Sequence, residues 1–221
     1  MIKMVGFDLD GTICDSLPMC MEAFMNAVIP YTDHELSEKE IVSTFGLNEA
    51  GMVKAVVKND WEAALDRFYE NYQNLHDMCI TPFEGIRELI GFLKQNQIIV
   101  PLITGKGEKT CEITLTKLGL NHTFDDILYG SEKYRCKKEN ILYLLEKYAI
   151  EKEEFFYIGD TLQDAADCHS IGVTCLSAAW AELANPNLLK DYNPYTFESV
   201  AGLKKFLDIA VKQNKPHNPP L

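Results

Sequence analysis

The feature that most constrains the fold is an alternation of short apolar runs with amphipathic helical patterns, which continues from Pro82 toward the C-terminus. The apolar runs are rich in Val, Ile, Phe and Tyr and end in small or acidic residues, as buried strands do. The predicted strands are residues 4–7, 98–103, 127–129, 155–158 and 173–176. The predicted helices between them are residues 85–95, 108–118, 139–148 and 164–170. This alternation predicts an α/β fold with a doubly wound, mostly parallel, Rossmann-like sheet covered by helices on both faces.

Residues 15–82 interrupt the alternation. The segment has no convincing strand, but it has amphipathic helical stretches at 19–28, 38–45 and 61–76. The simplest account is an all-helical domain inserted after the first strand, above the strand ends. We therefore predict an α/β catalytic core of residues 1–14 and 83–221 and a helical cap of residues 15–82. A last helix is expected at 199–211, and the polar, Pro-rich end QNKPHNPPL is expected to fray.

The composition limits which cellular locations and which binding partners are expected for the protein. A formal net charge of -12 argues against nucleic acid as a partner, because nucleic-acid binding needs a concentrated basic face. No run approaches the roughly 18 apolar residues of a membrane helix, and no signal peptide is recognisable. The seven cysteines are odd in number and lack CxxC spacing, which indicates reduced thiols. We expect a cytoplasmic protein, monomeric or a small homo-oligomer, that does not bind membranes.

Two carboxylates lie two residues apart at the end of the first predicted strand, in FDLDGT. Because residues i and i+2 of an extended chain point the same way, Asp8 and Asp10 can face one site. Gly11 then permits a tight turn beside a ligand. Acids placed together at the end of a buried strand need a compensating cation. A turn with an N-capping aspartate is the structural alternative for this motif alone.

A second acidic strand end occurs in YIGDTLQD, where Asp160 follows the strand and Asp164 lies one helical turn further on. Parallel strands present their carboxyl ends at one edge of the sheet, so both acidic pairs should converge. Together they supply the hard oxygen ligands that suit Mg²⁺, which binds about one or two protein carboxylates together with water and phosphate oxygens. Metal-assisted phosphate chemistry is the leading hypothesis.

Two further segments can hold a phosphate. Thr104 ends the strand in LITGK, where its hydroxyl and the backbone amide of Gly105 can contact phosphate oxygens. Lys137, ahead of the helical pattern ENILYLLEK, can place an ammonium at the same locus. Lys138 is its rival, because the sequence leaves the register open by one residue.

FDLDGT, LITGK, the lysine before ENILYLLEK and YIGDTLQD resemble the four motifs of the haloacid dehalogenase-like (HAD) hydrolase superfamily, in the family's order. The stretches DGTICDSLP, TPFEGIRELIGFLK and TKLGLNHTFDDILYG resemble its phosphoglycolate phosphatase-like branch, in which a small helical cap follows the first motif. The resemblance therefore implies a Mg²⁺-dependent phosphatase with a capped Rossmann-like core.

The resemblance also implies a role for each site residue. Asp8 would attack phosphorus and form an aspartyl-phosphate, and Asp10 would act as general acid and then general base. Mg²⁺ would be held by Asp8, the backbone carbonyl of Asp10 and Asp160, with Asp164 acting through water. The residues expected to bind the substrate phosphate are Leu9, Asp10, Thr104, Gly105 and Lys137.

The acidic composition of the predicted cap favours a small substrate. Residues 15–82 contain four basic and twelve acidic residues, a poor clamp for a polyphosphate or a nucleic acid. A small-molecule phosphate ester is therefore expected, and the cap residues that select it cannot be named from sequence.

Two alternatives remain open at this level. One is a phosphotransferase of the same family, such as a sugar phosphomutase, in which a substrate hydroxyl replaces water. The other is a non-catalytic regulator that keeps the fold and a bound metal, although the intact acids Asp8 and Asp10 speak against it.

Overall fold

A computed structural model of the chain describes residues 1–212, apart from the side chains of Glu38 and Val42, so the predicted fraying of residues 213–221 lies outside the described residues. Six parallel strands form one sheet in the order β3-β2-β1-β4-β5-β6. They are β1 (Met4–Phe7), β2 (Leu102–Ile103), β3 (Ile127–Leu128), β4 (Phe155–Gly159), β5 (Thr174–Ala178) and β6 (Thr196–Phe197). The predicted parallel α/β fold is confirmed.

The first strand lies at the centre of this sheet. Met4 pairs with Phe155 and Phe7 with Ile158 on one side, while Phe7 pairs with Leu102 on the other. The strand predicted at 98–103 is assigned only over its last two residues, with an isolated bridge at Ile99. Pro101 lies between the two and has no amide hydrogen to donate. Its carbonyl still accepts from the Phe7 amide at 3.0 Å, so the chain remains extended beside β1.

Helices cover both faces of the sheet, as predicted. Apolar residues of α5 (Ile86–Gln95), α6 (Glu108–Lys117) and α10 (Val200–Lys212) pack with Val5 and Phe7 in one hydrophobic cluster. Those of α7 (Lys137–Tyr148) and α8 (Leu162–Ile171) pack with Met4 and Phe155 in a second. Residues that alternate along β1 thus enter opposite layers, which is the geometry of a doubly wound sheet.

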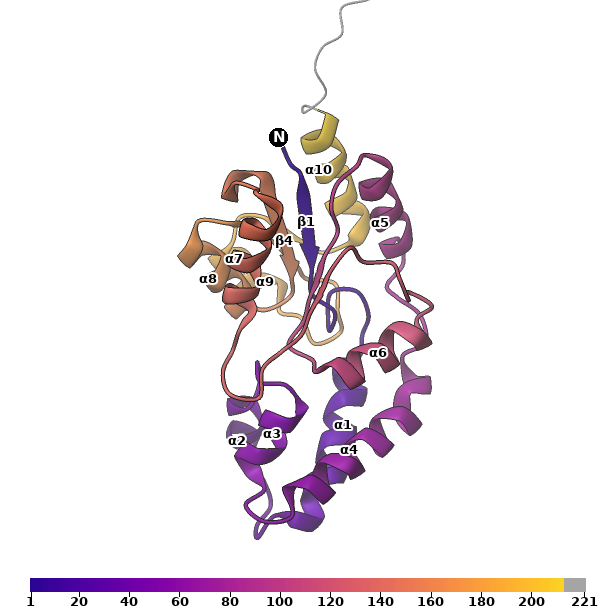
Figure 1. Cartoon of the computed structure of the whole chain (residues 1–221), viewed down its shortest axis with the longest axis vertical. Helices are drawn as coiled ribbons and strands as arrows, with labels where there is room; N and C mark the ends of the chain where they lie inside the picture. Colours follow the sequence, from indigo (N-terminus) through magenta and orange to yellow (C-terminus); the bar gives the residue numbers. More distant parts are fainter. Residues whose placement is uncertain (213–221) are drawn as a thin grey trace, which may run out of the picture.

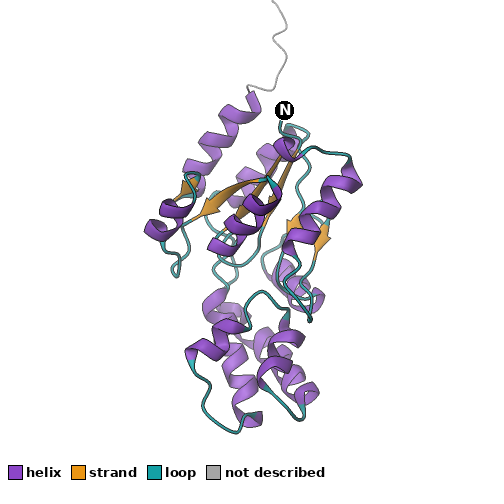
Figure 2. Ribbon diagram, turned by 90° about the vertical axis from the view of Figure 1, so that its left-hand side faces the viewer, coloured by secondary structure: helices purple, strands orange, loops and turns teal. Residues whose placement is uncertain are grey.

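The helices of residues 15–82 pack around a core of their own, beyond the carboxyl ends of the strands (Figure 1). They are α1 (Leu17–Val28), α2 (Glu38–Ser43), α3 (Glu49–Val56) and α4 (Trp61–Leu75). Phe24, Phe68 and Tyr72 are buried between α1 and α4. Figure 2 shows this bundle as a group of helices next to the sheet, without strands of its own.

Three elements were absent from the sequence prediction: α3, α9 (Pro186–Tyr192) and the edge strand β6. Short turns of 3-10 helix also occur at Ile29–Tyr31, His76–Met78 and Lys152–Glu154. Helix α7 begins at Lys137, two residues before its predicted start, and α8 begins at Leu162. None of the described helices combines the length and the apolar character needed to cross a membrane.

Candidate active site

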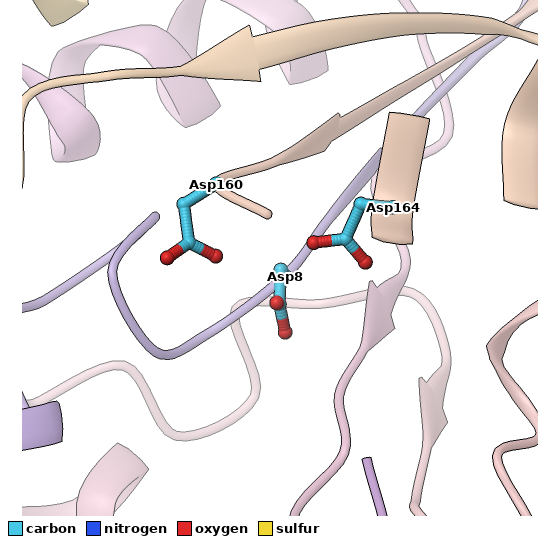
Figure 3. A group of neighbouring side chains, drawn as sticks. All are labelled: Asp8, Asp160 and Asp164. Carbon is cyan, nitrogen blue, oxygen red and sulfur yellow. The ribbon is translucent and has the colours of Figure 1, made fainter. Parts of the chain in front are cut away.

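Three adjacent strands deliver the predicted site residues to one edge of the sheet. Asp8 follows β1, Thr104 follows β2 and Asp160 follows β4. Asp8, Asp160 and Asp164 each place one carboxylate oxygen within 4.8 Å of the others (Figure 3). Two loops separated by about 150 residues of chain therefore form a single acidic cluster, as the parallel arrangement of the strands predicts.

Close backbone approach brings these two loops together. Gly11 adopts φ +71°, in the left-handed region that favours glycine. A Cβ atom at this position would overlap the carboxylate of Asp160. The glycine of FDLDGT is therefore required both for the turn and for the contact with the second acidic loop.

Asp164 is fixed by a capping box at the start of α8. Its amide donates to the Thr161 hydroxyl at 3.0 Å, and its Oδ2 accepts from the Thr161 amide at 3.2 Å and the Thr161 hydroxyl at 2.6 Å. The capping box thereby fixes the orientation of the Asp164 carboxylate. Oδ1 accepts from Lys137 Nζ at 2.7 Å, so one oxygen caps the helix and the other faces the site.

Lys137 is the lysine that reaches this cluster. Its ammonium donates to Asp8 Oδ2 at 2.5 Å as well as to Asp164, and its side chain is 18% exposed. Lys138 forms no ion pair with any of the described residues and does not line the cavity. Because α7 begins at Lys137, the two neighbouring side chains project about 100° apart around the helix.

The cluster carries more negative charge than one lysine compensates. Burial, opposed by Lys137, raises the pKa of Asp8 from 3.8 to about 7. Burial and the neighbouring carboxylates of Asp8 and Asp164 also raise the pKa of Asp160 well above its ordinary value. Burial opposes the charge on Lys137, but the Asp164 and Asp8 carboxylates raise its pKa overall. Three all-oxygen ligands with unbalanced charge fit a hard divalent cation such as Mg²⁺.

Asp10 lies outside this cluster and is paired with a residue that sequence reasoning missed. Its Oδ1 accepts from the Ser16 hydroxyl and from Lys106 Nζ, the latter at 3.1 Å. Lys106 is only 4% exposed, and its ammonium also lies 4.7 Å from the centre of the Tyr72 ring. Burial disfavours this ammonium, but the Asp10 carboxylate raises the pKa of Lys106 overall. The only sequence signal was its place two residues after Thr104.

The predicted phosphate ligands lie at the strand ends with different exposure. Thr104 is fully buried, and its hydroxyl accepts from the Lys106 amide at 3.1 Å. Leu9 is also buried, and its amide donates to Asp8 Oδ1 at 2.7 Å. Gly105 lines the cavity above the cluster together with Asp10 and Lys137. The roles of Leu9, Thr104 and Gly105 toward phosphate stay predictions.

A cavity of about 520 Å³ separates the acidic cluster from the helices of residues 15–82. Glu49, at the start of α3, helps to close it, because its carboxylate accepts from the Gly107 amide at 2.9 Å and from the Thr110 hydroxyl. The adjoining Asn48 donates through Nδ2 to the Gly130 carbonyl at 3.2 Å. These contacts join α3 to the first turn of α6 and to the loop after β3.

Known proteins resemble the chain over most of its length. The sequence pattern of haloacid dehalogenase-like hydrolases matches residues 5–178. A phosphoglycolate phosphatase of Neisseria meningitidis is 29% identical over 190 residues, which are 78% of this chain and 80% of that protein. The pyrophosphatase PpaX of Bacillus cereus is 22% identical over 195 residues, 87% of this chain and 90% of that protein.

A solved structure supports the fold independently. A hydrolase from Pseudomonas syringae superposes with a TM-score of 0.77 at 21% sequence identity, over 94% of this chain and 98% of that chain. The match over residues 5–178 includes FDLDGT, LITGK, Lys137 and YIGDTLQD, the four segments on which the resemblance was based. The chain belongs to the haloacid dehalogenase-like hydrolase family.

Proposed function

We propose that the protein is a Mg²⁺-dependent phosphatase that hydrolyses a small phosphomonoester through an aspartyl-phosphate intermediate. The observation that carries this proposal is the convergence of Asp8, Asp160, Asp164 and Lys137 at the floor of one cavity. Nucleophilic carboxylate, metal ligands and a cation are the groups that phosphoryl transfer needs. The phosphatase names of two relatives support the same reaction class.

The residues proposed to hold magnesium are Asp8, the backbone carbonyl of Asp10 and Asp160, with Asp164 acting through water. When bound, the ion supplies positive charge between the carboxylates and the substrate phosphate, which lowers the electrostatic cost of bringing two anions together. Lys137 contributes a second positive charge at the same place, because its ammonium already contacts Asp8 and Asp164.

In the proposed first step, an oxygen of Asp8 bonds to phosphorus while the bond from phosphorus to the alcohol oxygen breaks. Asp10 donates a proton to that leaving oxygen. In the second step Asp10 accepts a proton from water, the water oxygen bonds to phosphorus, and the bond to Asp8 breaks. Lys137, the Thr104 hydroxyl and the amides of Leu9, Asp10 and Gly105 are proposed to hold the phosphate oxygens.

Asp10 must exchange partners to take this role. In the structure its carboxylate is held by Ser16 and Lys106. Asp10 nevertheless lines the cavity, within reach of a ligand there. Binding of an ester is proposed to replace the Lys106 contact by a hydrogen bond to the leaving oxygen.

Residues 15–82 are proposed to act as a cap that closes this site over a small-molecule ester, with the rest of the chain as the catalytic core. The formal net charge of -12 speaks against nucleic acid as a partner, and a cytoplasmic enzyme without nucleic-acid or membrane partners is proposed. A monomer or small homo-oligomer is proposed.

Phosphate release from a panel of phosphomonoesters, with Mg²⁺ and then with a chelator, tests the proposal. We expect release that depends on Mg²⁺ and returns when the ion is restored. Analysis of sugar phosphates in the same reactions separates hydrolysis from the mutase alternative, which would yield an isomer instead of free phosphate. A folded protein that releases no phosphate from any ester, with partner binding unaffected by Asp8→Asn, would support the regulator instead.

A further inference from the structure

The cavity above the acidic cluster is larger than a phosphate site alone requires. Its volume of about 520 Å³ falls within the range of roughly 300–1,000 Å³ that is typical of sites for organic ligands. Asp8 and Lys137 lie on one side of it, and residues of α1, α3 and the segment between α2 and α3 lie on the other. The space beyond the phosphate position is therefore shaped by the helices.

The helical side of the cavity is apolar. Five half-buried side chains line it: Leu17, Met21, Phe45, Leu47 and Met52. We call these five residues the helical wall. Met21, Phe45 and Met52 also pack against the buried core of the helical bundle. Each is thus anchored on one side and presents its remaining surface to the cavity.

The helical elements contribute no cation of their own to the described lining of the cavity. Among the described lining residues of α1, α3 and the segment that precedes α3, the charged residue is Glu49, and it is negative. The whole lining contains three cations against six carboxylates. A second anionic group on the substrate would have to be desolvated beside apolar atoms and a carboxylate, which is unfavourable.

The three lining cations come from other elements, but two of them reach the helical side of the cavity: Lys106 Nζ lies 4.0 Å from Cys20 Sγ of α1, and Arg135 lies against Gly46. Lys137 is bonded to Asp8 and Asp164, and Lys106 is paired with Asp10. Arg135 is exposed and its side chain lies against Gly46, at the solvent side of the loop that precedes α7. Only Arg135 could reach a second anionic group without giving up a carboxylate partner, which makes it the competing explanation to be tested.

We propose that the preferred substrate is a phosphomonoester whose alcohol is uncharged and carries an apolar chain or ring that packs against the helical wall. This inference rests on the proposed phosphatase function and names its substrate class. It predicts a selectivity that differs from the names of the two relatives, because phosphoglycolate and pyrophosphate each carry a second anionic group in place of an apolar one.

Linear alkyl phosphates provide the test, because lengthening the chain changes the buried apolar area and scarcely changes the leaving oxygen. With Mg²⁺ present, kcat/KM is measured for ethyl, butyl and hexyl phosphate, 2-phosphoglycolate and pyrophosphate. One buried methylene corresponds to about a fourfold gain. We expect hexyl phosphate to exceed ethyl phosphate by about 50-fold or more, with phosphoglycolate and pyrophosphate no better than ethyl phosphate. A flat series, or a preference for either doubly anionic substrate, overturns the inference.

Two methionines of α1 form a matched pair of variants. Met21 and Met25 are both half-buried and both pack against the bundle core, but only Met21 lines the cavity. Met21→Ala should reduce the ratio of hexyl to ethyl phosphate kcat/KM by about tenfold, while Met25→Ala leaves that ratio as it is. Equal effects of Met21→Ala and Met25→Ala on this ratio would contradict the proposal that the helical wall binds the alkyl chain. A loss of phosphoglycolate activity in Arg135→Gln that exceeds the loss with hexyl phosphate shows that Arg135 binds the second anion, and also overturns the inference.

Binding measurements keep this inference separate from the proposed function. Hexylphosphonate and phosphonoacetate resemble the two classes of ester but cannot be hydrolysed in the same way. Titration calorimetry with Mg²⁺ should show at least tenfold tighter binding of hexylphosphonate. If no ester is hydrolysed but this preference is found, the phosphatase proposal fails and the pocket assignment stands. If esters are hydrolysed but phosphonoacetate binds more tightly than hexylphosphonate, the phosphatase proposal stands and the pocket assignment fails.

Discussion

The two sides of the cavity are built in different ways. The strand-end wall consists of Asp8, Asp10, Lys137, Asp160 and Asp164, which are charged and oriented by hydrogen bonds and ion pairs. The helical wall is apolar, and three of its five residues, Met21, Phe45 and Met52, pack against the core of their own bundle. Directional contacts fix the position of reacting atoms, whereas apolar contacts select mainly by area and shape. Under the two proposals above, the strand-end wall carries out the reaction and the helical wall selects the alcohol.

The largest effect is expected from substitution of Asp8, the proposed nucleophile. Asp8→Asn should lower the kcat of phosphate release by about 10³-fold or more, because Asp8 is the proposed nucleophile. Asp167→Asn is the control, since Asp167 also lines the cavity but is bonded to Gln163 outside the acidic cluster. Steady-state kinetics should show less than about a threefold change for that variant. Comparable losses in both would mean that the cavity's general charge, and not Asp8, supports the reaction.

The next largest effect is expected at Lys137, and the neighbouring Lys138 provides the matched control. Lys137→Met should reduce kcat/KM by about 10²-fold, because it removes the ammonium that contacts Asp8 and Asp164. Lys138→Met should change kcat/KM by less than about threefold. The same kinetic assay, with circular dichroism to confirm folding, distinguishes the two. A larger effect at Lys138 would contradict the assignment made from the position of the helix start.

The pH dependence of stability tests the strand-end wall through the buried carboxyl group of Asp8. Burial raises the pKa of Asp8 to about 7 from an ordinary value of 3.8. The folded state then binds this proton more tightly than the unfolded state does. Protonation of Asp8 therefore stabilises the folded state, fully below about pH 4, and this stabilisation is lost as pH rises to about 7. In a chelator, wild type should therefore lose stability relative to Asp8→Asn between pH 5 and 7.5.

Thermal unfolding of the two proteins measures that difference. We expect the Tm of Asp8→Asn minus that of wild type to grow by about 5 °C over this range, given roughly 2–4 °C per kcal/mol for a chain of this size. Addition of Mg²⁺ should remove most of the pH dependence of wild type, because the ion takes the place of the proton. A difference that stays constant with pH would show that Asp8 remains ionised in the metal-free protein.

The smallest expected effect concerns the contact between α3 of the helical bundle and the α/β part of the chain. Glu49→Gln keeps a hydrogen-bond acceptor for the Gly107 amide but removes the charge that favours the first turn of α6. A loss of about 1 kcal/mol, or roughly 2–4 °C in Tm, is expected. Lys54→Met removes an exposed ion pair with Glu132 between the same two regions and should change Tm by about 1 °C or less. Equal Tm shifts for the two variants would mean that the buried contact of Glu49 with the Gly107 amide stabilises the protein no more than the exposed ion pair does.

Much of the strand-end wall could be predicted because its residues lie in short motifs at the ends of parallel strands. The positions of Asp8, Asp160 and Asp164 relative to one another follow from the sheet topology alone. The choice between Lys137 and Lys138 could not be made, since it depends on where α7 begins, and helix boundaries are uncertain by a few residues.

The missed features depend on contacts between distant parts of the chain. Lys106 is held by Asp10 and by the ring of Tyr72, which belongs to α4, and no local pattern connects these three residues. Helix α3 is short and contains Gly51, which weakens its helical pattern. Its N-cap Asn48, like Asn185 and Pro186 at the start of α9, was the signal that could have identified it.

The central place of β1 has a consequence for how the molecule tolerates damage. Asp8, Thr104 and Asp160 follow β1, β2 and β4, which are neighbours in the middle of the sheet, whereas β3 and β6 form its two edges. Edge strands exchange their amide hydrogens and fray before central ones. The sheet can thus open at its edges, or accumulate substitutions there, while these three residues stay assembled until the central strands separate.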